Sequence, residues 1–403
     1  MSTLTVPQAR RFQRAALTAT GIDSLGTGSY VSAAVVLFTQ HLSVNPAAVG
    51  FGLTLSAISG MLASLPISAL ADRWGNLRVF TCSYILRALG TLVWVFISGD
   101  AQYLAYSLLF GVIDRSAASL TRSLMVAPLS KEDSIRLIGL TALPANIGYG
   151  LGAGLSALVL FLNLPIIVIL GLNSATFIFV IILYRLTLRD LDLSKADVSP
   201  SVITSWTRIK SSLDSSHRRR IVFDNFLFSF HRTFLNVYFP LAVVVYAPNY
   251  VWVVPVLFVV NAVVVALTQA AVNAWADQRN RHQKLWGISG LLLGISMFPV
   301  PLFAAVGEDV AGKLLIGLLI VQIAAEIAQS AALTVYMVRM SREENLATDL
   351  SAINLGGQFQ NITGPAIFSS LVVPERWPLA ILAGAVIGAR GVLVLRRPSN
   401  PSL

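Results

Sequence analysis

Charged side chains interrupt several long apolar stretches of this chain, and these side chains are the ones best suited to chemistry. Asp23 has small neighbours, and Asp114 and Arg115 lie in the middle of another apolar stretch. A charge in an apolar helix is costly and usually faces a cavity or an opposite charge. A carboxyl group in such a setting can bind and release a proton near neutral pH. We therefore interpret Asp23, Asp114 and Arg115 as proton-coupling candidates. A structural ion pair that involves Arg87 is the alternative.

A polar stripe marks a later apolar segment. Gln322, Glu326 and Gln329 are spaced so that they share one face of a helix. In an apolar segment such a face is typical of the lining of a cavity, and Glu326 becomes a further proton-coupling candidate. Gln322 and Gln329 are candidates for contact with a substrate. The other candidates for the substrate cavity are His231, Arg232, Asn354 and Gln358. A histidine can titrate near neutral pH, and a satisfied buried polar residue is the alternative for His231.

The composition is that of a membrane protein. The chain has 403 residues, of which 55% are hydrophobic and 12% charged, against about 25% charged in soluble proteins. A membrane-spanning helix needs about 20 mostly apolar residues. The candidate spans are 16–40, 48–70, 77–98, 102–126, 137–161, 165–186, 221–246, 251–274, 285–306, 311–337, 347–372 and 377–395. We expect an all-α membrane protein with twelve transmembrane helices, which excludes a soluble multidomain enzyme and a disordered chain.

The charges of the loops predict the orientation. Most of the 29 lysines and arginines fall on one side of the spans. The positive-inside rule then places both termini in the cytoplasm, and the chain as a multi-pass protein in the cell (inner or plasma) membrane. Because these charges are dispersed over short loops, we expect no nucleic-acid partner. The single Cys82 excludes a multi-cysteine metal site.

The sequence repeats itself across a polar stretch at 189–220. An Ala-Asp pair that ends with Asp72 recurs with Asp277, 205 residues later, and Asn146-Ile-Gly recurs as Asn354-Leu-Gly. We predict an N-terminal six-helix bundle at 1–188, a cytoplasmic linker at 189–220 and a C-terminal six-helix bundle at 221–403. Repeated bundles are typical of secondary transporters, which bind their substrate near the membrane midplane.

The loop after the second span carries a charged cluster. A carboxylate at the end of a span can pair with an arginine of a neighbouring helix, and we expect Arg122 to pair with Asp72. Such a cluster can act as a cytoplasmic latch that holds one conformation, and an ordinary interfacial anchor is the alternative. The proposed latch residues are Asp72, Arg73, Gly75, Arg78 and Arg122, with Asp277, Arg279 and Arg281 in the second half.

This loop resembles the signature G-x-x-x-D-R-x-G-R-R/K of the major facilitator superfamily. The match comprises Asp72, Arg73, Gly75 and Arg78, whereas Ser68, Asn76 and Leu77 depart from the pattern. With twelve spans and a central polar loop, the resemblance covers essentially the whole chain. It implies two pseudo-symmetric six-helix bundles and transport by alternating access.

The fifth span also resembles a motif of this superfamily. Its small residues are spaced for close helix packing, and the exporter branch often carries a glycine- and proline-rich motif here. The motif residues are Pro144, Asn146, Gly148, Gly150, Gly152 and Gly154. Proline precedes the glycines in this chain instead of lying among them. The resemblance points to the twelve-span drug/proton antiporter branch, whose members often carry an acidic residue in span one.

These features together predict a proton-coupled exporter of small amphipathic molecules, such as drugs or natural products. A proton-coupled symporter that imports a small polar nutrient is the alternative, and a channel or receptor stays open. No catalytic or ATP-binding motif is present, so we expect neither an enzyme nor an ATP-driven pump, and no cofactor or metal. The expected partners are the substrate, protons and the lipid bilayer, and the expected state is a monomer.

Overall fold

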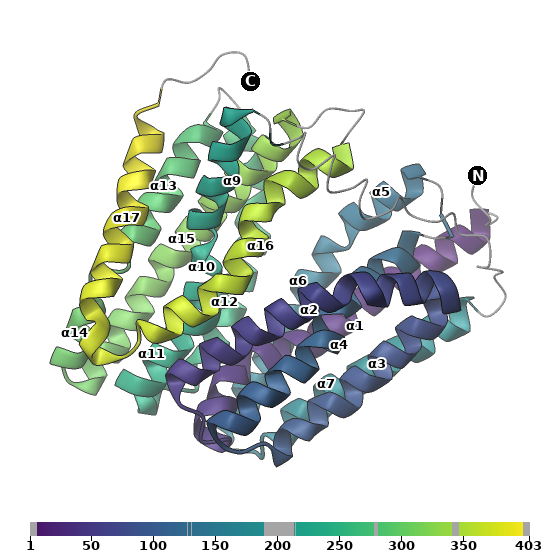
Figure 1. The fold of residues 1–403 in the computed structure, drawn as a ribbon, viewed down its shortest axis with the longest axis horizontal. Helices are drawn as coiled ribbons and strands as arrows, with labels where there is room; N and C mark the ends of the chain where they lie inside the picture. The colour runs from purple at the N-terminus through teal and green to yellow at the C-terminus, as the bar shows by residue number, and fades with distance from the viewer. Residues whose placement is uncertain are drawn as a thin grey trace. The chain divides into compact units, whose positions relative to one another are not determined.

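The computed structural model of the protein is all-helical in the part that it describes. The described residues are 6–126, 128–129, 131–188, 213, 215–277, 281–340 and 346–397, and they contain no strand. Figure 1 shows the succession of long helices that the apolar segments form. Inside a bilayer only a helix satisfies all backbone hydrogen bonds within one such segment.

The described residues up to 188 form seven helices. Their bounds are α1 (Val6–Val36, continued by a π-turn at Leu37–His41), α2 (Pro46–Trp74), α3 (Asn76–Val93), α4 (Gly99–Val126), α5 (Lys131–Leu140), α6 (Ala142–Phe161) and α7 (Ile167–Leu188). Only Gly75 separates α2 from α3, and its φ of 92° lies in the region that favours glycine. The loop of the predicted latch is therefore a tight turn between two helices.

The second half is more interrupted. Its elements are α9 (Ser216–Phe228), α10 (Phe230–Thr233), a π-turn (Phe234–Tyr238), α11 (Phe239–Tyr246), α12 (Val253–Asp277), α13 (His282–Ile295), α14 (Val300–Ala305), α15 (Glu308–Met340), α16 (Leu346–Ser370) and α17 (Trp377–Leu395). The predicted span 285–306 is divided between α13 and α14 by a turn at residues 296–299, which ends with Pro299, because proline has no N–H to continue the backbone hydrogen bonding of a helix.

Ten helical segments in the described ranges are long and apolar enough to cross a membrane. The predicted spans 102–126 and 347–372 are helical as α4 and α16, but they fall outside this group. Their polar residues, such as Asp114 in α4 and Gln360 in α16, account for the difference. The helices agree with the predicted all-α, twelve-helix fold.

The chain divides into two compact units. One comprises 1–45, 55–199 and 252–262, and the other comprises 46–54, 200–251 and 263–403. The first turns of α2 therefore belong to the second unit, and the first turns of α12 to the first unit. Most of the predicted linker at 189–220 lies outside the described residues, and the predicted bundle boundaries stay predictions.

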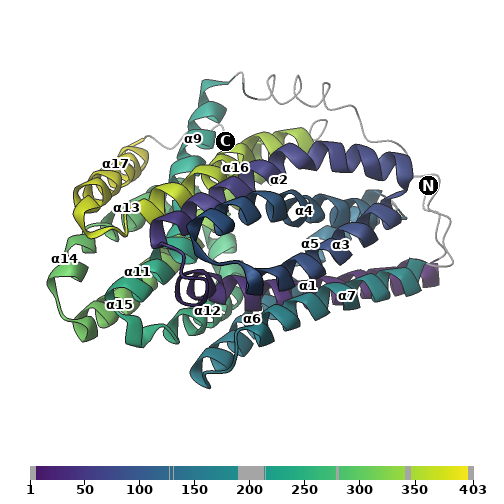
Figure 2. The ribbon, with the colours of Figure 1, turned by 60° about the horizontal axis from the view of Figure 1, so that its bottom comes forward.

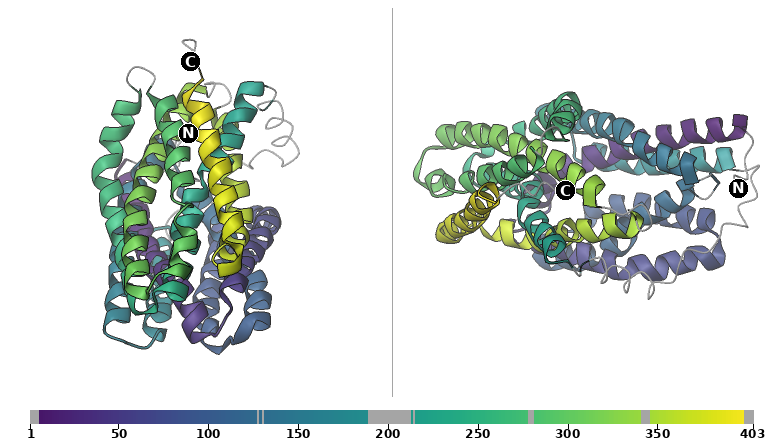
Figure 3. Two further views of the ribbon diagram at one scale, coloured as in Figure 1. Left: turned by 90° about the vertical axis from the view of Figure 1, so that its left-hand side faces the viewer. Right: turned by 90° about the horizontal axis from the view of Figure 1, so that it is seen from above.

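Within each unit the long helices lie side by side. In the first unit α1 packs between α6 and α7, and α3 also contacts α7 (Figure 2). In the second unit α13 lies between α15 and α17 (Figure 3). Many large apolar side chains of the long helices stay exposed, including Leu62 of α2, Leu109 of α4 and Leu267 of α12. Apolar surface on this scale is typical of helices that face lipid.

Candidate functional site

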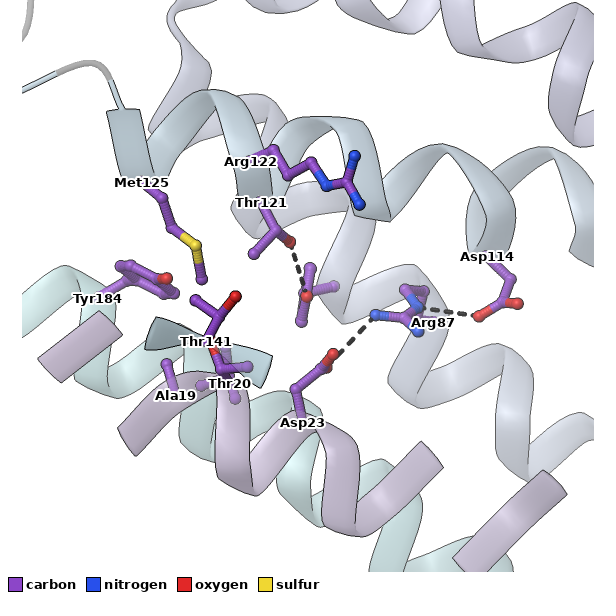
Figure 4. A pocket seen from close by; sticks show the side chains of 12 residues that line it. Ala19, Thr20, Asp23, Arg87, Asp114, Thr121, Arg122, Met125, Thr141 and Tyr184 are labelled. Carbon is purple, nitrogen blue, oxygen red and sulfur yellow. Dashed lines mark hydrogen bonds and ion pairs between the residues drawn. The ribbon is translucent and has the colours of Figure 1, made fainter. Parts of the chain in front are cut away.

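A cavity of about 260 Å³ lies among the helices of the first unit (Figure 4). It contains two carboxylates, two guanidinium groups and several hydroxyl groups. The lining residues are Ala19, Thr20 and Asp23 of α1, Tyr84 and Arg87 of α3, Asp114, Thr121, Arg122 and Met125 of α4, Thr141, and Val180 and Tyr184 of α7. It combines apolar walls with a few converging polar groups, as binding sites for small molecules do.

Arg87 lies between the two carboxylates of the cavity. Its Nε donates to Asp114 Oδ1 over 3.0 Å, and its Nη1 lies 3.6 Å from Asp23 Oδ1. The guanidinium also lies over the ring of Phe177, 4.0 Å from the ring centroid, a favourable position for a cation. The Arg87 side chain is 9% exposed, against 29% for Asp23 and 32% for Asp114. The buried cation thus joins two carboxylates that reach the cavity.

Asp23 is held less tightly than Asp114. In the described structure its Oδ1 accepts no hydrogen bond, and its 3.6 Å distance to Arg87 exceeds that of a normal N–H···O hydrogen bond. This oxygen is therefore available to a proton, and the Tyr84 hydroxyl lies beside the same carboxylate. Protonation would remove one of the two negative charges that hold Arg87.

Hydroxyl groups cover another part of the cavity wall. Thr20 Oγ1 donates to the Ala16 carbonyl over 2.8 Å, and Thr141 Oγ1 donates to the Ile138 carbonyl over 2.6 Å. Because their hydrogens are used within the backbone, these two threonines offer acceptor oxygens to the cavity. The buried hydroxyl of Tyr184 has no hydrogen-bond partner among the residues that the structure describes. The cavity therefore offers both acceptors and an unused donor.

Close packing of α1 on α6 positions Asp23. A Cβ atom on Gly148 would overlap the Gly21 carbonyl, and one on Gly152 would overlap the Leu25 carbonyl. Of the other glycines in the predicted span-five motif, Gly150 lies near Ala262 and Gly154 near Val259. Pro144 contacts Gly21, and Asn146 is exposed. The glycine spacing thus sets the approach of two backbones, while its antiporter role stays a prediction.

The structure brings together some of the proton-coupling candidates and separates others. Asp23 and Asp114 share the cavity, and Arg87, considered in the sequence only as a partner, joins them. Arg115 is exposed, and its Cβ lies against Gly60 of α2. Glu326 is half-buried in α15 of the second unit. Neither of these two residues lines this cavity.

The polar candidates of the second unit form contacts between helices. Gln322 Nε2 donates to Ser296 Oγ. Gln329 Nε2 donates to Asn225 Oδ1 over 3.0 Å, and Gln360 Nε2 donates to Thr233 Oγ1. The sequence pattern did not indicate a role for Asn225, Ser296 or Gln360, because an isolated amide or hydroxyl in a span is a weak signal. His231 is buried, whereas Arg232, Asn354 and Gln358 are exposed. A role in substrate binding stays a prediction for all of these candidates.

Asp277, which the sequence predicts to be part of the second-half latch, has a partner that the sequence did not suggest. Arg339 Nη2 of α15 donates to Asp277 Oδ1 of α12 over 2.9 Å. Arg281 instead lies over the ring of Trp275, and Arg279 lies outside the described residues.

The first-half latch is described only in part. The side chain of Asp72 lies outside the described residues, so its predicted pairing with Arg122 stays a prediction. Arg73 and Arg78 are exposed, and Arg122 lines the cavity.

A second buried charge cluster lies in the second unit. Asp224 of α9 is fully buried and pairs with Arg390 over 2.5 Å and with Arg397 over 3.1 Å. The two ion pairs join α9 to α17, which contains Arg390, and to the residues that follow it, which include Arg397. Within the described ranges no group of three or more histidines, cysteines, aspartates or glutamates is arranged to hold a metal ion.

Solved structures show where this fold occurs. The nucleoside transporter NupG, in a mutant form, has a TM-score of 0.76 at 12% identity, over 96% of this chain and 100% of that chain. A POT family transporter in complex with a thioalcohol-conjugated peptide has a TM-score of 0.70 at 12% identity, over 95% of each chain. A bacterial homologue of the human lysosomal transporter Spinster, inward-facing and unoccupied, has a TM-score of 0.69 at 12% identity, over 98% of each chain. These identities support the fold alone.

At the level of sequence, a search of curated proteins finds no match. The profile of the Major Facilitator Superfamily, however, matches residues 16–307, which is more than half of the chain. The apolar helices, the repeated halves and this match agree. The chain belongs to the Major Facilitator Superfamily and is a multi-pass membrane transporter.

Proposed function

We propose that this transporter is a proton-coupled exporter of small amphipathic molecules and that Asp23 is its proton-binding carboxylate. One half of the chain would rock against the other around a central substrate site, in the alternating-access cycle that repeated bundles support. The resemblance of spans one and five to the exporter branch supports the direction. The cell membrane, with both termini in the cytoplasm, is the proposed location, and a monomer is the proposed state.

The observation that carries the proposal is the Asp23–Arg87–Asp114 cluster. Two carboxylates share one buried guanidinium, and such a cluster holds one net negative charge until a proton binds. Asp23 is the site for that proton because its Oδ1 accepts no hydrogen bond among the described residues. Its protonation leaves Arg87 paired with Asp114 alone, so the ion pair that joins α1 to α3 becomes sensitive to the proton.

Coupling then follows from the helices that carry the three residues. Asp23, Arg87 and Asp114 come from α1, α3 and α4, so the ion pairs join three helices. If one arrangement of these helices is stable only when Asp23 is uncharged, protonation of Asp23 shifts the two-state equilibrium towards that arrangement. Export requires that substrate and proton occupy the site in turn. A cationic or neutral amphipathic substrate that displaces the Asp23 proton meets this requirement.

Import by proton symport is the second candidate. Arg122 lines the same cavity, and the buried Tyr184 hydroxyl offers a further donor there. These groups suit a substrate that carries an anionic group. Protonation of Asp23 would remove a negative charge from the cavity and thereby favour the binding of an anion. Proton and substrate would then bind together and move in the same direction.

The test uses purified protein in liposomes that carry an imposed pH gradient. Three naphthyl compounds of similar size serve as substrates: a permanently cationic trimethylammonium, a neutral sulfonamide and an anionic sulfonate. A pH indicator inside the liposomes follows protons, and radiolabel follows the compounds. Antiport predicts that the cation or the neutral compound collapses the gradient while it moves against the protons. Movement of the sulfonate with the protons selects symport instead.

Two variants connect this flux to the cavity. Asp23→Asn removes the titrating group and keeps its shape, so proton movement should fall to the level of empty liposomes. Asp100→Asn is the matched control, because Asp100 lies at the start of α4, outside the cavity, and accepts from the Asn45 N–H over 2.7 Å. Wild-type proton coupling in Asp23→Asn would exclude Asp23 as the proton site. Compound flux without any proton flux in the wild type would exclude proton coupling.

A further inference from the structure

Helix α16 contains a proline in its interior. Pro365 has no N–H to donate within the helix, and its ring crowds the preceding turn. Gly364 precedes it and lies close to the side chain of Thr233, where a Cβ atom would overlap Thr233 Oγ1. Such a turn is the natural point for α16 to change its bend.

The hydroxyl of Thr54, from α2, lies at this turn. Thr54 Oγ1 donates to the Ile362 carbonyl over 2.8 Å and accepts from the Ala366 N–H over 3.2 Å. In an uninterrupted helix, the carbonyl of residue 362 and the N–H of residue 366 would pair with each other. The threonine hydroxyl therefore competes for both members of one backbone hydrogen bond.

Other contacts fit the start of α2 to the same stretch of α16. A Cβ atom on Gly50 would overlap the Pro365 carbonyl and Ser369 Oγ. Ser369 Oγ donates to the Ala47 carbonyl over 3.2 Å. All of these residues belong to the second unit, although α2 continues from Leu55 into the first unit. The segment 46–54 is thus packed on one unit and covalently joined to the other.

We propose that Thr54 is a positioning residue for the transport cycle, whose hydroxyl holds the Pro365 turn of α16 open. While the start of α2 packs on α16, the hydroxyl bridges Ile362 and Ala366. When α2 leaves, the carbonyl and the N–H pair with each other and the bend of α16 changes. The inserted hydroxyl thereby makes the shape of α16 depend on the position of α2. This inference rests on alternating access and is independent of the coupling ion.

The direct test measures the separation of α2 and α16 in the full-length protein. Spin labels are attached through Phe51→Cys and Ile367→Cys, two exposed positions, in a Cys82→Ser background. Thr54→Val keeps the shape of the side chain and removes the hydroxyl. Because two hydrogen bonds are lost, we expect the ratio of separated to packed molecules to rise about 5- to 20-fold. Thr54→Ser keeps the hydroxyl and should restore the wild-type distribution.

The same measurement in a Pro365→Ala background isolates the role of the helix break. Alanine removes the ring and restores the N–H at position 365, which pairs with the carbonyl of residue 361. The regular helix then also closes the bond between Ile362 and Ala366 without Thr54, so Thr54→Val should shift the distribution by less than about twofold. Thr268→Val is the matched control, since its hydroxyl donates to Val264 within its own helix, and it should leave the distribution unchanged.

Three outcomes would overturn the proposal. They are an unchanged distribution in Thr54→Val, a Thr54→Ser protein that behaves like Thr54→Val, and a valine effect of equal size with and without Pro365. The labels are read without substrate or pH gradient. Failure of proton coupling at Asp23 would therefore leave this result interpretable, and failure here would leave the proton measurement intact.

Discussion

The two units of this transporter use corresponding positions in opposite ways. Asn146 and Asn354 are separated by 208 residues, and the same interval separates Asp114 from Gln322. In the first unit Arg87 donates to Asp114, whereas in the second Gln322 donates to Ser296. An ion pair that faces a cavity thus corresponds to a neutral hydrogen bond in the helix packing.

Helix packing shows the same mixture of repetition and divergence. Gly148 and Gly356 are also 208 residues apart, and each brings its helix against the backbone of another, α6 on α1 and α16 on α9. One turn later the halves differ, because Gly152 continues the close packing while Gln360 donates to Thr233. The repeat has kept the architecture and changed the chemistry.

This difference bears on the proposed coupling of transport to protons. A neutral amide network has a hydrogen-bonding energy that is independent of pH near neutrality, whereas a carboxylate that shares an arginine responds to a single proton. We therefore expect the first unit to carry the proton response and the amide network of the second unit to support its packing.

Breaking the ion cluster should give the largest effect. Arg87→Met leaves Asp23 and Asp114 without their shared cation, so we expect the free energy of unfolding to fall by about 3–5 kcal/mol and transport to be lost. Unfolding in mixed micelles and flux in liposomes measure the two effects. Adding Asp23→Asn and Asp114→Asn should recover most of the stability but no proton movement. Arg185→Met, at an exposed arginine of α7 outside the cavity, is the control.

Changing the two corresponding glycines tests whether equal packing supports unequal functions. Gly148→Ala and Gly356→Ala each push a methyl group into a neighbouring backbone, and each should cost about 1–3 kcal/mol of stability. Gly148→Ala also displaces the α1 turn that carries Asp23, so it alone should reduce proton movement per substrate. Gly171→Ala is the control, because a Cβ atom there meets no atom within 4 Å. Equal loss of coupling in both variants would contradict the division of roles.

The lengths of the apolar segments were enough to predict the helices. The charged residues inside these segments were enough to single out Asp23 and Asp114, which both line the cavity. The sequence could not show that Arg87 joins both, because the rotations of α1, α3 and α4 decide which faces meet. The contact of Thr54 with Ile362 and Ala366 was hidden for a related reason, since it joins residues about 300 positions apart. The local sequence pattern was enough to predict a latch at Asp277, but not its Arg339 partner, which lies 62 residues away.

Removing an amide from the second unit should have a smaller effect. Gln329→Leu loses the donors to Asn225 and Ser229, and a hydrogen bond between membrane helices contributes about 1 kcal/mol. We expect a loss of stability of this size, with the ratio of protons to substrate unchanged in liposomes. Gln358→Leu, at an exposed position of α16, controls for the added apolar surface. A changed ratio in Gln329→Leu would place part of the coupling in the second unit.

The smallest effect is expected at the end of α12, where the second half keeps a charged pair. Asp277 and Arg339 are joined at 2.9 Å, and the Asp277 side chain is 66% exposed. Exposed pairs contribute little to stability, so Asp277→Asn should leave the unfolding transition in place. If the pair holds one conformation of the transport cycle, its loss should instead lower the turnover number about two- to fivefold with little change in KM. Initial rates over a range of substrate concentrations separate the two quantities.

Arg339→Lys should retain part of the turnover, because lysine keeps the charge but not the two-pronged donor geometry of arginine. An unchanged turnover number in Asp277→Asn would reduce this pair to an interfacial anchor.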